Sequence, residues 1–431
     1  MRLAYVLLSY LVAPLVLLFL LWRGLRNRAY WERLPERFGI GLPEYELQTI
    51  WVHAVSVGEV QAAAGLIERL LGSFPGKPLI LTTVTPTGAA HAKALFGDRV
   101  HHHYAPYDLP GSVSRFFTNI NPCIMIVIET ELWPTLYHTC GVHKVPLILA
   151  SARISPRSVG KYRRFVRLFS EALSHGIVIA AQSESDAERF RSLGANPSRT
   201  HTTGNIKFDF ELPAEVYKKG RLARQQHAAN RPVLVAASTH DNEEALVLDA
   251  MRKVWTVHPT CLLIIAPRHP ERFELVARIL DDRGLSYVTR TSRKLCSENT
   301  QVLLLDTLGE LRNYYAACDV AFVGGSLVPV GGHNLLEPAA LAKPIISGTH
   351  LFNTEDVANK MVTSGAALLV DSTGELADRV IGLLSDESTR RIAGAAGKKV
   401  VDDNRGALDK LIELIEPLLV DDRQAINSRY Y

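Results

Sequence analysis

The chain has few cysteines and no histidine or cysteine cluster with the spacing of a metal site. Its 431 residues contain five scattered cysteines, none in a Cys-x-x-Cys pair: Cys123, Cys140, Cys261, Cys296 and Cys318. This usage is typical of a reducing compartment and predicts neither a disulfide framework nor a zinc site. The run His101–His103 has no acidic or cysteine cluster near it, so we interpret it as part of a strand.

Several enzyme signatures are also missing. No Gly-x-Gly-x-x-Gly follows a strand-like run, which argues against a dehydrogenase, and no complete phosphate loop, His-Glu-x-x-His or Gly-x-Ser-x-Gly sequence occurs. No Asp-x-Asp pair occurs either, so a nucleotide-sugar site that holds a metal through paired aspartates is unsupported. We therefore predict no metal and no cofactor.

Positive charge is concentrated at the amino terminus. The whole chain has 48 lysines and arginines against 44 acidic residues, for a net charge of +4. Residues 1–40 hold six arginines and two glutamates, so the remaining residues are neutral in sum. This distribution argues against a nucleic-acid partner, which needs a basic surface on the folded domain.

The basic residues flank a long apolar segment. Leu3–Trp22 contains twenty residues without a charge, which as a helix would span roughly 30 Å, the thickness of a bilayer's hydrocarbon core. A cleaved signal peptide fits poorly, because the run is too long and no small-residue cleavage site precedes the arginines. Five arginines follow the segment and only Arg2 precedes it, so the positive-inside rule places the rest of the chain in the cytoplasm, at the inner membrane.

From residue 50 onward, short β-branched runs alternate with helical stretches, and nearly continuous apolar strands of this kind indicate parallel sheets covered on both faces. We predict an α/β protein with two doubly wound, Rossmann-like domains that face a cleft, preceded by a transmembrane helix. The expected division is an anchor with its basic flank (1–28), a first α/β domain (29–208), a linker (209–230), a second α/β domain (231–405) and a C-terminal helix and tail (406–431). That helix is expected over Ala407–Leu419, with a frayed end after it.

In open α/β sheets, ligands bind beyond the carboxyl ends of the strands. The most informative stretch of this kind is Gly324–Ala340, GGSLVPVGGHNLLEPAA. Its paired glycines allow close approach of backbone, and Asn334 is a good N-cap for a helix that begins at Leu335 and would suit a phosphate. Glu337 in the first turn could bind a ribose diol. A glycine-rich turn before a well-capped helix is the plainer alternative.

Acidic residues follow two other strand-like runs. In VHAVSVGEV, the strand end delivers Ser56 and Glu59 to the edge of the sheet, where Glu59 is a candidate general base or merely complements a helix dipole. In IMIVIETELWP, Glu129 and Glu131 follow an apolar strand. Positions i and i+2 of an extended chain share a face, so both carboxylates could enter one site, although a solvated loop is equally consistent.

Basic and polar residues complete the set of candidates. Ser151–Arg167 interleaves Arg153, Arg157 and other cations with apolar residues, which suits anionic lipid or a phosphorylated acceptor, or else a solvated helix face. Smaller features that follow strands are Lys207, Ser238–His240, Pro267–His269 and Gly309–Glu310.

Taken together, these stretches resemble the 3-deoxy-D-manno-octulosonic acid (Kdo) transferase family of lipopolysaccharide synthesis. The matching segments run from residue 53 to residue 340 in the family's order: HAVSVGEV, TTVTPTG, ETELWP, SARIS, GNIKFD, IAPRHPER, DTLGEL and GGSLVPVGGHNLLEPAA. The resemblance implies an inverting, metal-independent glycosyltransferase of the GT-B type, with CMP-Kdo as donor and a lipid A precursor (lipid IVA) as acceptor. It also implies that the domain over 29–208 binds the acceptor and that the domain over 231–405 binds the nucleotide-sugar donor.

The resemblance also implies roles for particular residues. Glu59 would accept the proton of the attacking hydroxyl, and Glu129, or else Glu131, would stabilise the transition state together with Lys207. Ser56, Arg153 and Arg157 would lie on the acceptor side. The residues implied in CMP binding are Pro267, Arg268, Leu308, Gly309, Glu310, Asn334, Leu335, Leu336 and Glu337.

Two other interpretations stay open at this point. One is a GT-B enzyme that uses a different nucleotide sugar, or an epimerase built on the same scaffold, because a fold alone does not determine activity. The other is a membrane-tethered scaffold or binding protein that performs no chemistry. The carboxylates at several strand ends argue against this second class.

Overall fold

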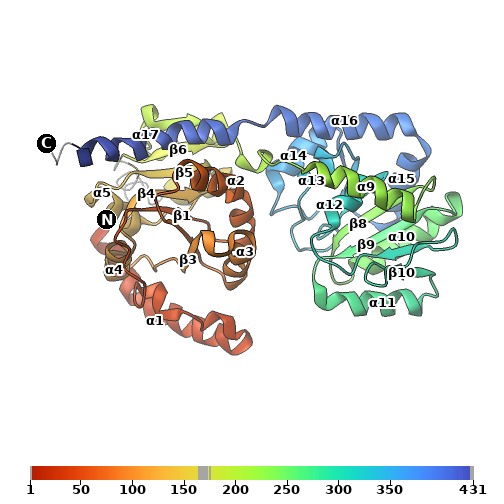
Figure 1. The fold of residues 1–431 in the computed structure, drawn as a ribbon, viewed down its shortest axis with the longest axis horizontal. Helices are drawn as coiled ribbons and strands as arrows, with labels where there is room; N and C mark the ends of the chain where they lie inside the picture. The colour runs from red at the N-terminus through yellow and green to blue at the C-terminus, as the bar shows by residue number, and fades with distance from the viewer. Residues whose placement is uncertain (1, 164–172, 174–175, 428–431) are drawn as a thin grey trace. The chain divides into compact units, whose positions relative to one another are not determined.

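The computed structural model describes residues 2–163, 173 and 176–427, which form two compact α/β units (Figure 1). The first unit contains Met1–Phe210 together with the chain from Asn404 onward, and the second contains Glu211–Asp403. Each unit is built on a seven-stranded parallel sheet with helices on both faces. The prediction of two doubly wound domains is therefore confirmed.

The first sheet has the strand order β3-β2-β1-β4-β5-β6-β7. Its strands are β1 (Thr49–His53), β2 (Leu79–Thr83), β3 (His101–Tyr104), β4 (Pro122–Ile128), β5 (Leu147–Ala152), β6 (Val178–Ala181) and β7 (Thr200–Thr202). The chain moves outward from β1 to β3 and then returns to the other side of β1 as β4. This reversal creates a switch point between β1 and β4, where the loops after both strands leave the same edge and make room for a ligand.

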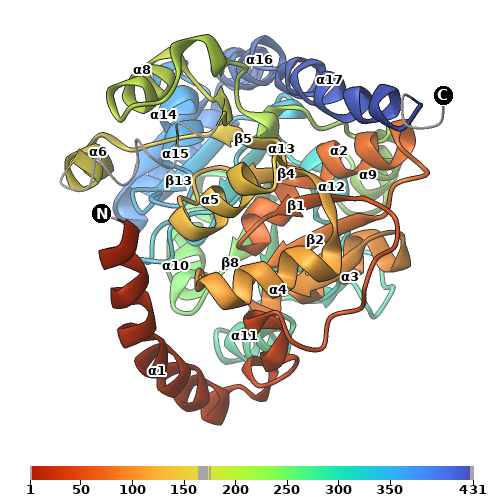
Figure 2. The same cartoon turned by 90° about the vertical axis from the view of Figure 1, so that its left-hand side faces the viewer.

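Helices of the first unit cover both faces of this sheet. One face is packed by α2 (Val57–Ser73), α3 (Pro86–Phe96) and α17 (Ala407–Asn427). The other face is packed by α4 (Pro110–Ile120), α5 (Pro134–Val142) and α8 (Glu184–Ser192), and Figure 2 looks onto α4 and α5. Helix α6 (Pro156–Arg163) follows β5.

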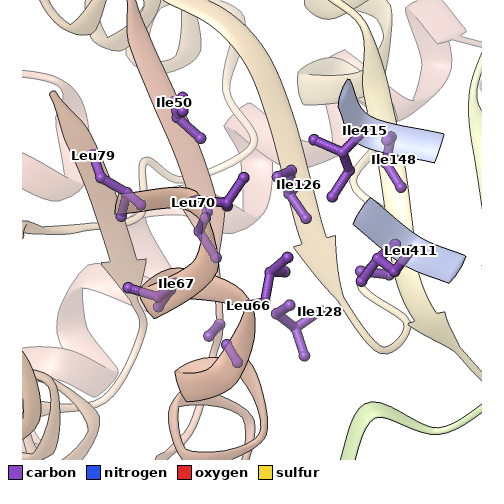
Figure 3. Packing of buried hydrophobic residues seen from close by; sticks show 14 of the residues in the cluster. Ile50, Leu66, Ile67, Leu70, Leu79, Ile126, Ile128, Ile148, Leu411 and Ile415 are labelled. Atoms are coloured by element: carbon purple, nitrogen blue, oxygen red, sulfur yellow. The ribbon is translucent and has the colours of Figure 1, made fainter. Parts of the chain in front are cut away.

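The C-terminal helix α17 completes the core of the first unit, nearly two hundred positions after the rest of that unit ends. Figure 3 shows Leu411 and Ile415 of this helix beside Ile126 and Ile148 of the sheet, and all four are buried. The loop before α17 is also fixed, because Asp209 accepts hydrogen bonds from the backbone N–H groups of residues 406 and 408 at 2.6 and 2.8 Å. The returning chain is thus an integral part of the first domain.

The amino-terminal helix α1 (Arg2–Arg26) is apolar and exposed. The stretch Arg2–Leu25 has a mean hydropathy of 2.5 and is long enough to cross a bilayer, which makes it a candidate anchor. The Tyr5 hydroxyl donates to Asp108 at 2.7 Å, and the Trp31 indole donates to the Leu21 carbonyl at 3.2 Å. Two short 3-10 turns, η1 (Arg28–Tyr30) and η2 (Leu34–Phe38), lead from α1 to β1.

The second sheet has the order β10-β11-β9-β8-β12-β13-β14. Its strands are β8 (Val233–Thr239), β9 (Leu262–Pro267), β10 (Tyr287–Thr289), β11 (Val302–Leu304), β12 (Val320–Val323), β13 (Ile345–Gly348) and β14 (Ala367–Val370). Helices α10 (Glu243–Val257), α11 (Phe273–Asp282) and α15 (Thr373–Ser385) pack one face, and α9 (Ala214–His227) and α12 (Leu311–Ala317) pack the other. The remaining helices are α13 (Leu336–Ala340), α14 (Glu355–Thr363) and α16 (Glu387–Asp403).

Two details differ from the sequence-based expectations. The segment 209–230, expected to be a linker, contains helix α9, whose Val216 is buried in the core of the second unit. The helix expected over Ala407–Leu419 passes through Pro417 and continues to Asn427, where a frayed end was expected. Leu411, Ile415 and Leu419 pack on the sheet before and after the proline, so tertiary burial outweighs its helix-breaking tendency.

We predict that Leu411→Ala destabilises the first unit by about 2–5 kcal/mol, because it removes a fully buried side chain and leaves a cavity. Glu413→Ala, an exposed change on the same helix, should stay within about 0.5 kcal/mol of the wild type. Urea unfolding measures both. Equal stabilities for the two variants would contradict the packing of α17 against the sheet.

Candidate active site

Glu59 lies in the first turn of α2, just beyond the end of β1. Ser56 is the N-cap of this helix, and its hydroxyl accepts the Glu59 N–H at 3.4 Å. In return, the Glu59 carboxylate accepts the Val55 N–H at 2.5 Å. These reciprocal bonds resemble a capping box, and they fix the carboxylate at the edge of the sheet.

The surroundings of Glu59 raise its pKa to about 7. Burial is the largest cause, and the negative charges of Glu129 and Glu131 act in the same direction. The Val55 N–H and the Lys207 ammonium oppose the shift. A carboxyl group that titrates near neutral pH is well matched to general-base work, because it is both ionised and basic enough to accept a proton.

Glu129 and Lys207 form an ion pair at the same edge, with 2.5 Å between the Lys207 Nζ and Glu129 Oε1 atoms. Glu129 directly follows β4, and Lys207 lies in the 3-10 turn η5 (Ile206–Phe208) after β7. Both side chains stay partly exposed, 23% and 29% respectively, so they remain accessible to a ligand. The pair places one negative and one positive charge side by side near Glu59.

The backbone beneath this pair is held by a buried polar network. The Asn205 side-chain oxygen accepts the Lys207 N–H at 3.0 Å and the Ser151 hydroxyl at 3.4 Å, and its amide donates to Gln182 at 3.0 Å. Sequence reasoning did not single out Asn205 or Gln182. The only available signal was that Asn205 precedes Lys207 in GNIKFD, where an Asx turn would orient the lysine.

Glu131 has a different environment from Glu129. Its carboxylate accepts the Trp133 indole N–H at 2.8 Å, and its backbone carbonyl accepts the Tyr137 hydroxyl at 2.5 Å. Burial raises the pKa of Glu131. We expected Glu129 and Glu131 to share one face because the chain would be extended there. The chain is not extended at this point, because Glu129 has a left-handed backbone with φ 59°. The two carboxylates are nevertheless close enough to interact electrostatically.

Asp108 is another functional neighbour that the sequence did not reveal. Its carboxylate accepts the N–H groups of Thr135 and Leu136 at 3.0 and 2.8 Å, and so caps the first turn of α5. It also accepts the Tyr5 hydroxyl of α1. Asp108 thereby connects the apolar helix to the segment that follows Trp133. Burial raises the pKa of Asp108 despite these hydrogen bonds.

The three residues expected on the acceptor side have unequal support. The Ser56 hydroxyl is used in helix capping, and the Arg153 backbone N–H donates to the Thr130 hydroxyl at 3.1 Å. The side chain of Arg157 lies outside the described part of the chain, as do Arg164 and Arg167. The cationic character of this segment therefore stays a prediction.

In the second unit, the residues expected to bind the nucleotide follow β9, β11 and β12. Pro267 is buried at the end of β9, and the Arg268 side chain after it is exposed. Leu308 is 65% exposed, Gly309 has a left-handed backbone, and Glu310 accepts from Arg290 at 2.9 Å and from Thr307 at 2.6 Å. These residues lie in loops at the carboxyl edge of the second sheet.

The glycine-rich stretch ends in the short helix α13, which begins at Leu336, one residue later than expected. The N-cap of α13 is Leu335 and not Asn334 as expected, although the exposed Asn334 side chain accepts the Leu336 N–H at 2.9 Å. Leu335 is buried, and Glu337 is paired with Arg312 at 2.9 Å. The Glu337 carboxylate is thus held in one orientation.

Glu243 organises the start of this stretch, and sequence reasoning missed it. Its fully buried carboxylate accepts the N–H groups of Gly325, Ser326 and Leu327 at 2.7 to 3.0 Å, and that of His240 at 3.2 Å. A side chain at Gly324 would place its Cβ 2.6 Å from this carboxylate. The first glycine of this pair is therefore explained by a buried carboxylate of the protein itself, and Gly325 has a left-handed backbone with φ 67°.

Two doubly wound parallel-sheet units, with polar and charged side chains at the carboxyl edges of their strands, define a two-domain protein with the GT-B fold. The structure of UDP-GlcNAc 2-epimerase from Neisseria meningitidis shares this fold over 86% of this chain and 100% of that chain, with a TM-score of 0.58 and 13% sequence identity. The pattern of group 1 glycosyl transferases matches residues 233–400.

The chain belongs to the 3-deoxy-D-manno-octulosonic acid transferase family, whose pattern matches residues 32–210. A 3-deoxy-D-manno-octulosonic acid transferase from Haemophilus influenzae is 39% identical over 423 residues, which cover 97% of this chain and 99% of the relative. The protein of the same description from Bordetella pertussis is 35% identical, over 95% of this chain and 97% of the relative. The resemblance identified from the motifs is confirmed.

The raised pKa of Glu59 predicts a specific dependence of stability on pH. The Glu59 carboxyl group binds a proton more tightly in the folded protein than in the unfolded chain. The stability contributed by this protonation is therefore fully present below about pH 4.5, and it is lost as the pH rises through about 7. Glu59→Gln cannot ionise, and we expect its melting temperature to fall less than that of the wild type over this range. Glu46→Gln, at an exposed carboxylate, should follow the wild type. Identical pH slopes for all three proteins would contradict the shift.

Proposed function

We propose that the protein transfers Kdo from CMP-Kdo to a hydroxyl group of the lipid A precursor lipid IVA, with inversion at the anomeric carbon. The observation that supports this most directly is the grouping of Glu59, Glu129 and Lys207 at one edge of the first sheet. Membership of the family supports Kdo as the transferred sugar, and these three side chains support a mechanism for the transfer. The proposal that no metal is required rests on the sequence, which has no Asp-x-Asp pair.

In this mechanism, Glu59 removes the proton from the attacking sugar hydroxyl as the new C–O bond forms. A base is needed because the hydroxyl is a poor nucleophile while it keeps its proton. The capping bonds from Val55 and Ser56 hold the Glu59 carboxylate before substrate arrives, so little reorganisation is required during the reaction.

Glu129 and Lys207 would stabilise charge in the transition state. Displacement at a sugar's anomeric carbon passes through an oxocarbenium-like state, which carries positive charge. The Glu129 carboxylate can stabilise that charge, and the hydrogen bond from the Lys207 ammonium holds this carboxylate in place. The ion pair favours Glu129 over Glu131 for this role, because Glu131 is already bonded to Trp133.

The second unit would hold the CMP portion of the donor. As the donor bond breaks, negative charge grows on the CMP phosphate, and the exposed Arg268 guanidinium suits that charge. The Pro267, Leu308 and Gly309 backbone would contact the nucleotide. The carboxylates of Glu310 and Glu337, oriented by their arginine partners, would accept hydroxyl or amino protons of cytidine. Asn334, Leu335 and Leu336, at the start of α13, complete the proposed binding set.

The decisive experiment incubates the purified full-length protein with CMP-Kdo and lipid IVA and follows the products by mass spectrometry. We expect the lipid mass to increase by whole Kdo units, with release of CMP. Transfer from UDP-sugars instead, or epimerisation of a nucleotide sugar without a lipid product, would contradict the proposal. Absence of any reaction would favour a binding protein.

Replacement of the proposed base separates chemistry from binding. We predict that Glu59→Gln lowers kcat by roughly 10²–10⁴-fold and leaves CMP affinity within about twofold of the wild type, because the base acts only on the acceptor. Steady-state kinetics and CMP titration measure the two effects. Glu46→Gln serves as the matched control, and unimpaired transfer by Glu59→Gln would remove Glu59 from the mechanism.

We propose further that α1 is a single-pass anchor of the inner membrane, with both α/β units in the cytoplasm. Five arginines follow its apolar segment and only one precedes it. A crossing helix would carry Tyr5 to the far side of the bilayer and open its contact with Asp108. That contact would persist only if α1 lay along the membrane surface. The two arrangements of α1 place its amino-terminal end on different sides of the membrane, so they can be distinguished by experiment.

We predict that Arg2→Cys is labelled by a membrane-impermeant maleimide in intact spheroplasts, and that Arg28→Cys is labelled only after permeabilisation. The two changes remove the same charge from opposite ends of α1. Native cysteines contribute little, since all except Cys296 are buried. Labelling of both variants only after permeabilisation would instead show an in-plane helix with the Tyr5–Asp108 bond intact.

A further inference from the structure

Three histidines gather at the carboxyl edge of the second sheet, and the mechanism above uses none of them. His240 follows β8, His269 follows β9, and His333 lies between β12 and α13. The rings of His240 and His333 are nearly parallel, at 6°, with centroids 5.0 Å apart. The His269 ring meets His240 edge-on at 5.3 Å. The three loops thus converge on one small patch of imidazoles.

The His240 and His333 rings are in direct hydrogen-bond contact. Their Nε2 atoms lie 2.7 Å apart, so one nitrogen carries the proton and the other accepts it. Such a pair holds a single proton between its two Nε2 atoms. If a second proton were added, the N–H···N bond would have to open, and both nitrogens would become donors toward a third group.

The pair is fixed in place by the residues around it. Gly325 packs against both rings: a Cβ there would lie 2.9 Å from the His333 Cδ2 atom and 3.4 Å from the His240 Cδ2 atom. Glu243 binds the backbone N–H groups of both Gly325 and His240. One buried carboxylate therefore sets the positions of the two loops that carry the paired rings.

The groups that face the pair are mainly cationic. His240 interacts with His269, Arg268 and Arg272, and its acidic neighbour is Glu244. Glu244 is already bonded to Arg272 at 2.9 Å, so its charge is largely neutralised. Burial first, and then His240, Arg268 and His269, lower the pKa of His333 to about 3. The pair is consequently uncharged in the free protein at neutral pH, beside an exposed arginine.

We propose that His240 and His333 bind an oxyanion of the donor, next to Arg268, and that the pair takes up one proton from solvent as the anion binds. The accepting Nε2 gains a hydrogen, the N–H···N bond between the rings breaks, and both Nε2–H groups donate to anion oxygens. This inference rests on the proposed function for the ligand's identity. The donor offers two oxyanions of suitable chemistry, the CMP phosphate and the Kdo carboxylate.

Proton uptake gives the inference a signature that a purely structural role would lack. The anion stabilises the imidazolium form and raises its pKa, so binding tightens as the pH falls toward 6. A structural role of the same two rings would change protein stability but would leave no proton linked to the ligand.

The test is isothermal titration calorimetry of the full-length protein in detergent at pH 7, in two buffers that differ in ionisation enthalpy. The ligands are cytidine, CMP and CMP-Kdo. We expect uptake of about one proton with CMP or CMP-Kdo and none with cytidine. His240→Gln and His333→Asn should abolish the uptake and weaken binding by roughly tenfold, the effect of losing one charge-assisted hydrogen bond. His258→Gln, in the same unit but bonded to Ser385, is the matched control.

Each outcome distinguishes one assignment from another. Uptake with CMP that disappears in both variants assigns the phosphate, whereas uptake with CMP-Kdo alone assigns the carboxylate. If proton uptake persists in the variants, the proton is taken up by the CMP phosphate itself, and the inference is overturned. The inference is also overturned if the wild type binds both nucleotides without proton uptake. If the wild type binds neither, the donor assignment fails and this inference fails with it.

Discussion

The ion pair between Glu129 and Lys207 is the interaction on which the proposed site of the first domain depends. It lies at an edge of the sheet where Glu59, Glu129 and Glu131 interact with one another. Burial is the largest cause of the raised pKa of Glu59 and of Glu131. Lys207 Nζ lies 2.5 Å from Glu129 Oε1, so one positive charge contacts one of the three carboxylates directly. The same ammonium opposes the rise in the pKa of Glu59, which is about 7.

The position of that lysine depends in turn on long-range features of the fold. Lys207 is attached to the end of β7, at the margin of the sheet, while Glu129 follows the central strand β4. Asn205 connects this turn to Ser151 in β5 and to Gln182 directly after β6, and these two strands lie between β4 and β7. The nearby Asp209 receives the returning chain at the start of α17. The C-terminal helix therefore supports both the core and the turn that carries a proposed catalytic residue.

The sequence was sufficient to predict the two parallel-sheet domains, because their buried strands are continuous apolar runs between helices. It also identified Glu59, Glu129 and Lys207, since each follows a strand in a distinctive motif. It did not reveal Asp108 or Glu243, which accept backbone N–H groups far away in sequence, or Asn205, which contacts the distant side chains of Ser151 and Gln182. The i, i+2 argument for Glu131 failed because it assumed extended backbone where Glu129 is left-handed. Local patterns report periodicity, but they do not report which distant N–H groups require an acceptor.

Glu243 also changes the interpretation of the glycine-rich loop in the second domain. Such loops often bind phosphate through free backbone N–H groups. Here the N–H groups of Gly325, Ser326 and Leu327 are all directed at the buried Glu243 carboxylate. A donor phosphate cannot use them without displacing that anion. In the function proposed above, Arg268 and the paired histidines at the same edge are the side chains that would recognise the donor's negative charge.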